Sequence, residues 1–138
     1  QSNIAEAGER VLLLPHDPDA SAQRLRDALQ ARFGVPLAVI VTDSFGRPWR
    51  MGVCGTAIGC AGLAALVDLR GKPDRFGRAL RITQVAVADE IAAAATLAMG
   101  EADEGRPVVV VSGLAPEYFA ADMPAADLVR PTRMDLFR

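Results

Sequence analysis

The sequence predicts an α+β fold in which helices pack with a mixed β-sheet. The 138 residues are 51% apolar, which is enough for one domain with a sizeable core. Helical and strand patterns both occur, but between residues 51 and 82 they do not alternate regularly enough for a doubly wound parallel sheet. Aromatic residues make up only 5% of the chain, whereas alanine and glycine are abundant. We therefore expect a core of closely approaching backbones.

The first predicted helix follows a short apolar run at 11–14 that Pro15 ends. Asp17 is a suitable N-cap, Pro18 fits the first turn, and Gly34 suits the position just past the last turn. A helical stripe of apolar residues between these signals completes the pattern. The sequence therefore predicts a helix from Pro18 up to Gly34.

Two strands are predicted next. Leu37 to Thr42 is a continuous apolar run between Pro36 and Asp43, which is typical of a fully buried strand that ends at Thr42. The segment from Met51 to Leu69, MGVCGTAIGCAGLAALVDL, carries four glycines that disfavour a helix. It is predicted to be a bulged strand, or a backbone pressed against a ligand.

The second half of the chain begins with a charged Gly/Pro loop, RGKPDRFGR, at residues 70–78. Thr83 is the predicted cap of a helix from Gln84 to Met99, which is apolar nearly all round and therefore expected to be central. Gly100 ends this helix. Val108 to Val111 is predicted to be a strand, and residues 114–138 a surface-wrapping tail.

Charge and cysteine content exclude several classes of protein. The net charge of −2, with acids and bases interspersed, argues against a nucleic-acid or membrane-surface binder. The longest uncharged stretch, 51–67, is short for a membrane span and rich in glycine. Cys54 and Cys60 have neither a zinc spacing nor a disulfide pattern, so both are expected to be small buried residues of a cytoplasmic protein.

One short segment, VTDSFGRPWRMG, concentrates chemistry-bearing side chains after the first predicted strand. Asp43 and Ser44 together suit a hard cation such as Mg²⁺ or Mn²⁺, which takes oxygen ligands. Arg47 and Arg50 could bind phosphate oxygens in a bidentate manner. The alternative is structural: an Asx-turn in which Asp43 pairs with Arg47. The spacing alone leaves both interpretations open.

A second group of acids follows the predicted long helix. Glu101, Asp103 and Glu104 lie at a helix C-terminus, where the helix dipole disfavours negative charge. They are either simply solvated or stabilised by a cation. His16, the single histidine, and Trp49 are expected to have structural roles. The charged loop at 68–78 either covers an anionic substrate or is a solvated turn.

Several motifs resemble the coenzyme F420:L-glutamate ligase family, and the resemblance covers nearly the whole chain. The most specific block is DSFGRPWRMG at 43–52, and further matches are LLPHDPDASA at 13–22, AIGCAGLAALVDLRGKPDRFGRAL at 57–80, VAVADEIAAAATLAMGEADEGRPVVVVSG at 85–113 and DLFR at 135–138. Members of that family are longer and carry further residues before the point that corresponds to Gln1. The resemblance implies that residues 1–138 are the C-terminal portion of a larger two-domain ligase fold.

The resemblance also implies an activity. That family joins L-glutamate to the lactyl carboxylate of coenzyme F420-0, uses GTP and a divalent metal, and extends the tail through γ-linkages. The substrates implied here are therefore F420-0, L-glutamate and GTP, with Mg²⁺ or Mn²⁺ and with K⁺ as a further candidate cation. An acyl phosphate is the implied intermediate. The family tends to form homodimers, and the apolar segment 53–67 is one candidate for such an interface.

Carried over residue by residue, the resemblance assigns roles. Asn3 becomes a GTP contact, while the aspartate that precedes this asparagine in the family falls just before Gln1. Asp43 and Ser44 become metal-associated, although threonine is commoner than serine at the second position, and Glu101 becomes a ligand of a second metal. The nucleotide is expected to lie along 99–106, that is Met99, Gly100, Ala102, Asp103, Glu104, Gly105 and Arg106. The resemblance assigns no role to Arg47, Arg50 or Arg78; from residue type alone, Arg47 and Arg50 are expected to act in catalysis on phosphate or substrate charge, and Arg78 is a further candidate.

Two other hypotheses stay open. The chain could be a module that binds a nucleotide or a deazaflavin without catalysis, or an inactive structural half that needs a missing N-terminal part. The ligase hypothesis makes one geometric demand, that the Asp43 segment and the Glu101 segment meet.

Overall fold

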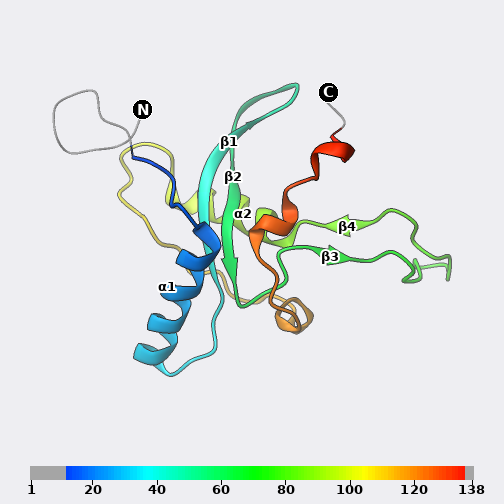
Figure 1. Cartoon of the computed structure of the whole chain (residues 1–138), viewed down its shortest axis with the longest axis horizontal. Coiled ribbons are helices and arrows are strands. Elements are labelled where there is room, and N and C mark those ends of the chain that lie inside the picture. Colours follow the sequence, from blue (N-terminus) through cyan, green and yellow to red (C-terminus); the bar gives the residue numbers. More distant parts are fainter. Residues whose placement is uncertain (1–11, 136–138) are drawn as a thin grey trace.

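The computed structural model describes residues 12–135, and Figure 1 shows their arrangement. A long hairpin of β1 (Val39–Arg47) and β2 (Arg50–Ala61) stands at the centre. Helices α1 (Pro18–Phe33) and α2 (Val87–Met99) both pack against it, mainly against β2. The short strands β3 (Val67–Asp68) and β4 (Gln84–Val85) begin and end an arm that extends away from the hairpin.

The α+β class is confirmed. Within it, β1 pairs with β2 and β3 with β4, and both pairs are antiparallel. Among the described residues, parallel pairing occurs as an isolated bridge between Ala64 and Met123, outside the named strands. The strands are therefore joined as local hairpins rather than by long crossovers.

Helix α1 forms as the sequence predicts. The side chain of Asp17 accepts a hydrogen bond from the backbone N–H of Ala20 at 2.9 Å, which satisfies one of the free amides of the first turn. At the other end Gly34 adopts φ +66°, and its N–H donates to the Gln30 carbonyl at 2.9 Å. Because the left-handed conformation is easiest for glycine, this residue ends the helix.

The first predicted strand is longer and less buried than expected. It does not end at Thr42 but continues as β1 to Arg47, because β2 folds back and pairs with it residue by residue through Asp43↔Thr56 and Ser44↔Gly55. Residues 39–44 are half-buried, so the prediction of a fully buried strand is wrong. The bulge predicted in the glycine-rich segment is confirmed, since Ile58 has no partner between the pairs Val41↔Gly59 and Thr42↔Ala57.

Helix α2 begins later than predicted. Thr83 does not cap it; Gln84 and Val85 form β4 against Val67 and Asp68, and the helix starts at Val87 without a side-chain cap. Pairing with β3 holds the backbone of these residues in a strand, which the apolar pattern did not reveal. The predicted end at Gly100 is confirmed, since its N–H donates to the Thr96 carbonyl at 2.9 Å.

The strand predicted at 108–111 does not form. This segment belongs to no strand in the described residues, and the side chains of Val108 and Val110 are 79% and 89% exposed. A strand requires a neighbour for its backbone hydrogen bonds, and no segment of residues 12–135 pairs with this one.

The core is built largely from alanine, as expected from the composition. The buried cluster contains one large aliphatic residue, Leu63, and consists of Ala57, Cys60, Leu63, Ala65, Val87, Ala88, Ala92 and Ala125. Small side chains allow α2 to lie close to β2. Cys60 is buried as predicted, whereas Cys54 is only half-buried.

The C-terminal segment contains three short 3-10 helices, η1 (Pro116–Phe119), η2 (Ala125–Leu128) and η3 (Thr132–Met134), of which η2 contains a buried residue. Its backbone is tied to the loop after β2, because the Ala64 N–H donates to the Tyr118 carbonyl at 2.8 Å. Ala125 of η2 is 3% exposed, so this segment contributes to the core at that point.

Candidate functional site

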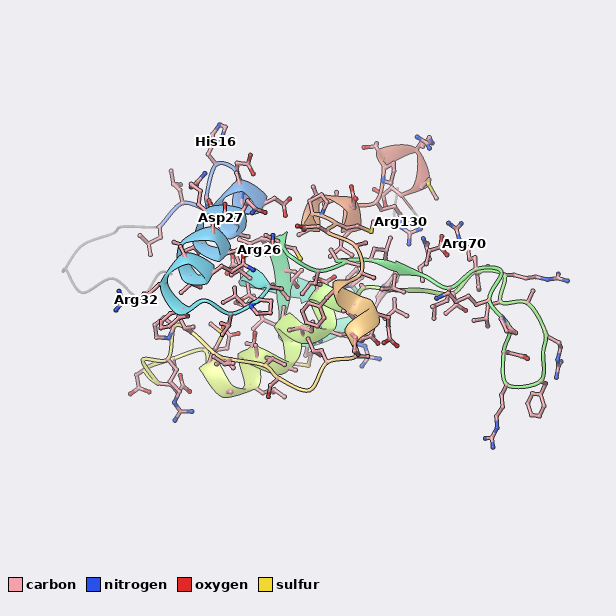
Figure 2. All side chains as sticks on the ribbon, turned by 90° about the horizontal axis from the view of Figure 1, so that it is seen from below. His16, Arg26, Asp27, Arg32, Arg70 and Arg130 are labelled. Carbon is pink, nitrogen blue, oxygen red and sulfur yellow. The ribbon has the colours of Figure 1, made fainter. Side chains whose placement is uncertain are left out.

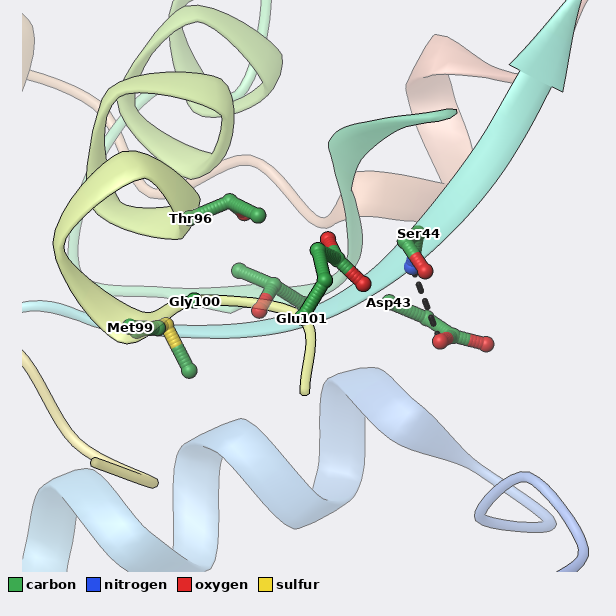
Figure 3. A pocket seen from close by; sticks show the side chains of 7 residues that line it. Asp43, Ser44, Thr96, Met99, Gly100 and Glu101 are labelled. Atoms are coloured by element: carbon green, nitrogen blue, oxygen red, sulfur yellow. Dashed lines mark hydrogen bonds between the residues drawn. The ribbon is translucent and has the colours of Figure 1, made fainter. Parts of the chain in front are cut away.

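A small cavity of about 140 Å³ lies between β1 and the end of α2 (Figure 3). Its lining comes from two segments far apart in the sequence: Thr42, Asp43 and Ser44 from β1, and Thr96, Met99, Gly100 and Glu101 from α2 and the loop after it. Figure 3 shows Glu101 between Thr96 and the Asp43–Ser44 pair. The meeting of the Asp43 and Glu101 segments that the ligase hypothesis demands is therefore present.

Asp43 is held in place by the strand and by its own local hydrogen bond. It lies inside β1, is half-buried, and its Oδ1 accepts from the backbone N–H of Ser44 at 2.8 Å. Arg47, the partner in the alternative Asx-turn interpretation, lies near the end of the hairpin, where its Nη2 donates to the Met51 carbonyl at 3.3 Å. The second carboxylate oxygen of Asp43 takes no part in this hydrogen bond.

The loop after α2 is folded by two charged side chains. The carboxylate of Glu104 accepts from the backbone N–H of Ala102 at 2.9 Å, and this hydrogen bond holds the pKa of Glu104 below its ordinary value. Arg106 Nη1 donates to the Ala98 carbonyl at 3.1 Å, one of the free carbonyls at the end of the helix. These contacts fold the loop against the end of α2.

Gly100 is required at the first turn of this loop. Its φ is +81°, and a Cβ there would lie 2.1 Å from Cδ of Glu104. The positive φ disfavours any residue with a side chain here, whereas the end of the flexible Glu104 side chain can move aside. Gly100 therefore directs the chain so that Glu101, the next residue, lines the cavity.

Other predicted site residues lie outside the cavity lining. Arg47 and Arg50 face each other across the end of the hairpin and are exposed. Ala102, Asp103 and Gly105 are exposed in the loop after α2. Asn3 lies outside the described residues. The roles assigned to these residues stay predictions.

Trp49 and His16 were expected to have structural roles. Trp49 is 88% exposed at the turn of the hairpin and adopts φ +54°, so it is not packed into the core of this chain. His16 lies at the exposed start of α1, as Figure 2 shows.

Sequence reasoning missed two hydroxyl residues, Thr42 and Thr96. Thr42 directly precedes Asp43. Thr96 comes three residues before Met99, and this spacing places both on one helix face. Helical spacing from the predicted site residues could therefore have found Thr96.

The donor set of the cavity fits a hard divalent cation bound with water and phosphate. Asp43 and Glu101 supply carboxylates, and Ser44 supplies a hydroxyl. Mg²⁺ commonly takes one or two carboxylates and completes its shell with water and substrate phosphates. Among residues 12–135, no three His, Cys, Asp or Glu side chains cluster closely enough to hold a metal by themselves. The cavity thus offers part of a metal site rather than a closed cage.

Within the described residues, no helix is both long and apolar enough to cross a membrane.

Comparison with known proteins identifies the family of this chain. The family model described as F420-0:Gamma-glutamyl ligase matches residues 1–113. Coenzyme F420:L-glutamate ligase of Methanothermobacter thermautotrophicus is 48% identical over 125 residues, which cover 91% of this chain and 50% of that protein. The enzyme of the same name from Methanopyrus kandleri is 48% identical over 130 residues, 93% of this chain and 52% of that protein.

A third relative of that name, from Methanocaldococcus jannaschii, is 44% identical over 138 residues, 100% of this chain and 53% of that protein. The chain thus spans about half the length of the curated relatives it matches. Together these matches show that the chain belongs to the F420-0:gamma-glutamyl ligase family.

Proposed function

We propose that the protein containing this chain ligates L-glutamate to the lactyl carboxylate of coenzyme F420-0 at the expense of GTP, and then extends the tail by γ-linkages. The observation that carries this proposal is the shared cavity: Asp43 and Glu101 come from separate segments and line one small polar space. Relatives that carry the name of this activity are 44–48% identical over most of the chain.

The reaction needs an activated carboxylate, because a carboxylate cannot expel oxide. In the proposed path an oxygen of the F420-0 carboxylate attacks the γ-phosphorus of GTP, and the bond to the bridging oxygen breaks to release GDP. The glutamate amine then attacks the acyl carbon, the C–O bond to phosphate breaks, and the nitrogen loses a proton to solvent. The products are the amide, GDP and phosphate.

The residues of the cavity would serve the first of these steps. Asp43, Ser44 and Glu101 would hold Mg²⁺ or Mn²⁺, which when bound neutralises charge on the transferring phosphoryl group. The nucleotide would lie along 99–106 and contact Asn3. Arg47 and Arg50 would pair with phosphate or substrate carboxylates from the end of the hairpin. K⁺ is a further candidate cation.

The test is a ligation assay on the purified protein with GTP, Mn²⁺, L-glutamate and F420-0, read by mass spectrometry. We expect a mass gain of one glutamyl unit, and we expect Asp43→Asn and Glu101→Gln each to reduce the rate by at least about 100-fold, since each removes a charge from the proposed metal site. Asp27→Asn, on the exposed face of α1, is the matched control and should keep the wild-type rate. Normal ligation by Asp43→Asn would contradict the proposal.

A second candidate is a structural half that needs further chain to become active. Two observations favour it: the chain spans about half of its relatives, and the described residues assemble no complete metal site. The same assay on the isolated 138-residue chain decides between them. Ligation by that chain would exclude the structural half, whereas a thermal shift with GTP and no mass gain would indicate a binding module.

We also propose a homodimer, to be tested by sedimentation velocity. The segment 53–67 is largely unavailable for such an interface, because Ala57, Cys60, Ala61 and residues 63–65 are buried within the chain itself. Apolar side chains at the exposed end of the hairpin, Met51 and Val53, are better candidates.

A further inference from the structure

Helix α2 touches β2 directly at Gly55. A Cβ built on Gly55 would lie 1.9 Å from Oγ1 of Thr96 and 2.7 Å from the backbone oxygen of Ala92. A threonine hydroxyl can rotate away, but a backbone oxygen can move only if the helix moves. The hydroxyl is also fixed, because Thr96 Oγ1 donates to the Ala92 carbonyl at 2.9 Å. Any side chain at residue 55 would therefore push α2 away from β2.

This contact lies beside the candidate site. Gly55 pairs with Ser44 across the hairpin, and Ser44 and Thr96 both line the cavity. Glu101 follows the last turn of α2. The separation of α2 from the hairpin at Gly55 thus determines how far Glu101 lies from Asp43.

A second contact holds the start of α2. Asp89 Oδ1 accepts from the backbone N–H of Ala57 at 2.9 Å, and Ala57 is buried in the core. Ala57 pairs with Thr42, another residue of the cavity lining. With one end tied to Ala57 and the other resting on Gly55, α2 has a defined direction along β2.

From these contacts we infer that Gly55 is a positioning residue, whose missing side chain lets the last turns of α2 lie on β2 and so sets the distance between the carboxylates of Asp43 and Glu101. This inference rests on the proposed function for its catalytic meaning. Its geometric content, the spacing of α2 and β2, is independent of which reaction the cavity serves.

The experiment compares Gly55→Ala with Gly46→Ala in the purified protein. Gly46 is a matched control, because it lies in the same hairpin and a Cβ there meets nothing within 4 Å. Mn²⁺ affinity is measured by electron paramagnetic resonance with GDP present, and the spacing of the two carboxylates by crystallography of each variant. Urea unfolding of each variant measures its folded fraction, so that Mn²⁺ affinities are compared between folded proteins.

We expect Gly55→Ala to weaken Mn²⁺ binding about 10- to 100-fold, the range typical of losing a supporting contact around a metal, with Gly46→Ala unchanged. A second change, Thr96→Ala, should restore part of the affinity, because it removes the hydroxyl contact but leaves the contacts with the Ala92 oxygen and with Cβ of residue 96.

Unchanged spacing of Asp43 and Glu101 in the Gly55→Ala crystal structure would overturn the inference, as would lost stability with unchanged Mn²⁺ affinity. If the wild-type protein binds no Mn²⁺, the proposed metal site fails, and the crystallographic spacing still decides whether Gly55 positions α2.

Discussion

At the scale of single residues, the ion pair of Asp68 and Arg70 predicts how the stability of the folded chain depends on pH. The guanidinium and the backbone N–H of Arg70 both donate to the Asp68 carboxylate, and these hydrogen bonds lower its pKa from 3.8 to about 2. Because the folded chain holds the carboxylate ionised, the contribution of Asp68 to stability is present above pH 3.8 and is lost as the pH falls towards 2.

An NMR titration of the Asp68 carboxyl carbon tests this prediction. The midpoint should lie near pH 2 in the wild type and move towards 3.8 in Arg70→Gln. The same midpoint for Asp68 before and after the substitution would show that Arg70 is not the cause.

The thiol of Cys60 predicts a loss of stability at high pH rather than at low pH. Burial, reinforced by the negative charges of Asp122 and Asp19, raises the pKa of its thiol from 9.0 to about 11. Its stabilising contribution is complete below pH 9.0 and is lost as the pH rises towards 11. The thiolate is the reactive form, so the thiol should be inert in the folded chain.

A Cys54→Ser variant leaves Cys60 as the single thiol, so that any modification is assigned to Cys60. We expect iodoacetamide at pH 8 to modify Cys60 only after urea is added. Rapid modification in native buffer, at the rate of a free cysteine, would contradict the burial seen here.

At the scale of elements, one carboxylate joins three parts of the fold. Asp19, in the first turn of α1, accepts from the backbone N–H groups of Cys60 and Ala125, both at 2.8 Å, and of Ala126 at 3.2 Å. It thereby connects α1 to β2 and to η2. Removing this acceptor would leave buried donors unpaired, at about 1–3 kcal/mol for each.

We therefore expect Asp19→Ala to lower the free energy of unfolding by about 2–4 kcal/mol in a urea titration. Asp19→Asn should cost less, because one amide oxygen can still accept from Cys60 and Ala125. Asp27→Ala on the same helix is the control and should change stability by no more than about 0.5 kcal/mol. Equal stability of Asp19→Ala and wild type would show that water replaces these contacts.

Elements with local signals were predictable, and elements that need a distant partner were not. Asp17 and Gly34 set the ends of α1 through contacts within a few residues. The start of α2 was misplaced, because the pairing of Gln84 with Asp68 is decided by the fold of the arm between them. The strand predicted at 108–111 failed for the same reason, since an apolar sequence cannot show whether a neighbouring strand exists.

The candidate site was predictable only in part. Asp43, Ser44 and Glu101 were identified from residue type and family motif, but nothing local shows that they share one cavity. That depends on α2 resting on Gly55 and on the bond between Asp89 and Ala57. Both contacts join residues more than thirty positions apart.

At the scale of the whole molecule, the described residues leave many large apolar side chains exposed to solvent. Leu97 is 90% exposed, and Val108 and Val110, which lie close together in one segment, are 79% and 89% exposed. Apolar side chains that gather on the surface promote association with another chain.

We therefore expect the isolated 138-residue chain to self-associate in sedimentation velocity as its concentration rises. Replacing Val108 and Val110 by lysine should reduce this association, because charges on an extended exposed segment oppose edge-to-edge pairing. Replacing Arg75 of the exposed arm by lysine is the control and should change nothing. A wild-type chain that stays monomeric and binds no hydrophobic dye would contradict this expectation.

The sequence by itself determined the α+β class, the limits of α1, the alanine-rich core and the membership of the ligase family, because each depends on local pattern or on residue identity. Only the tertiary structure decided that β1 runs on through Asp43, that Gln84 belongs to a strand, and that Asp43 and Glu101 line one cavity. These features depend on which backbones approach one another, and that approach is set by contacts such as the one at Gly55, where the absence of a side chain allows a helix to touch a strand.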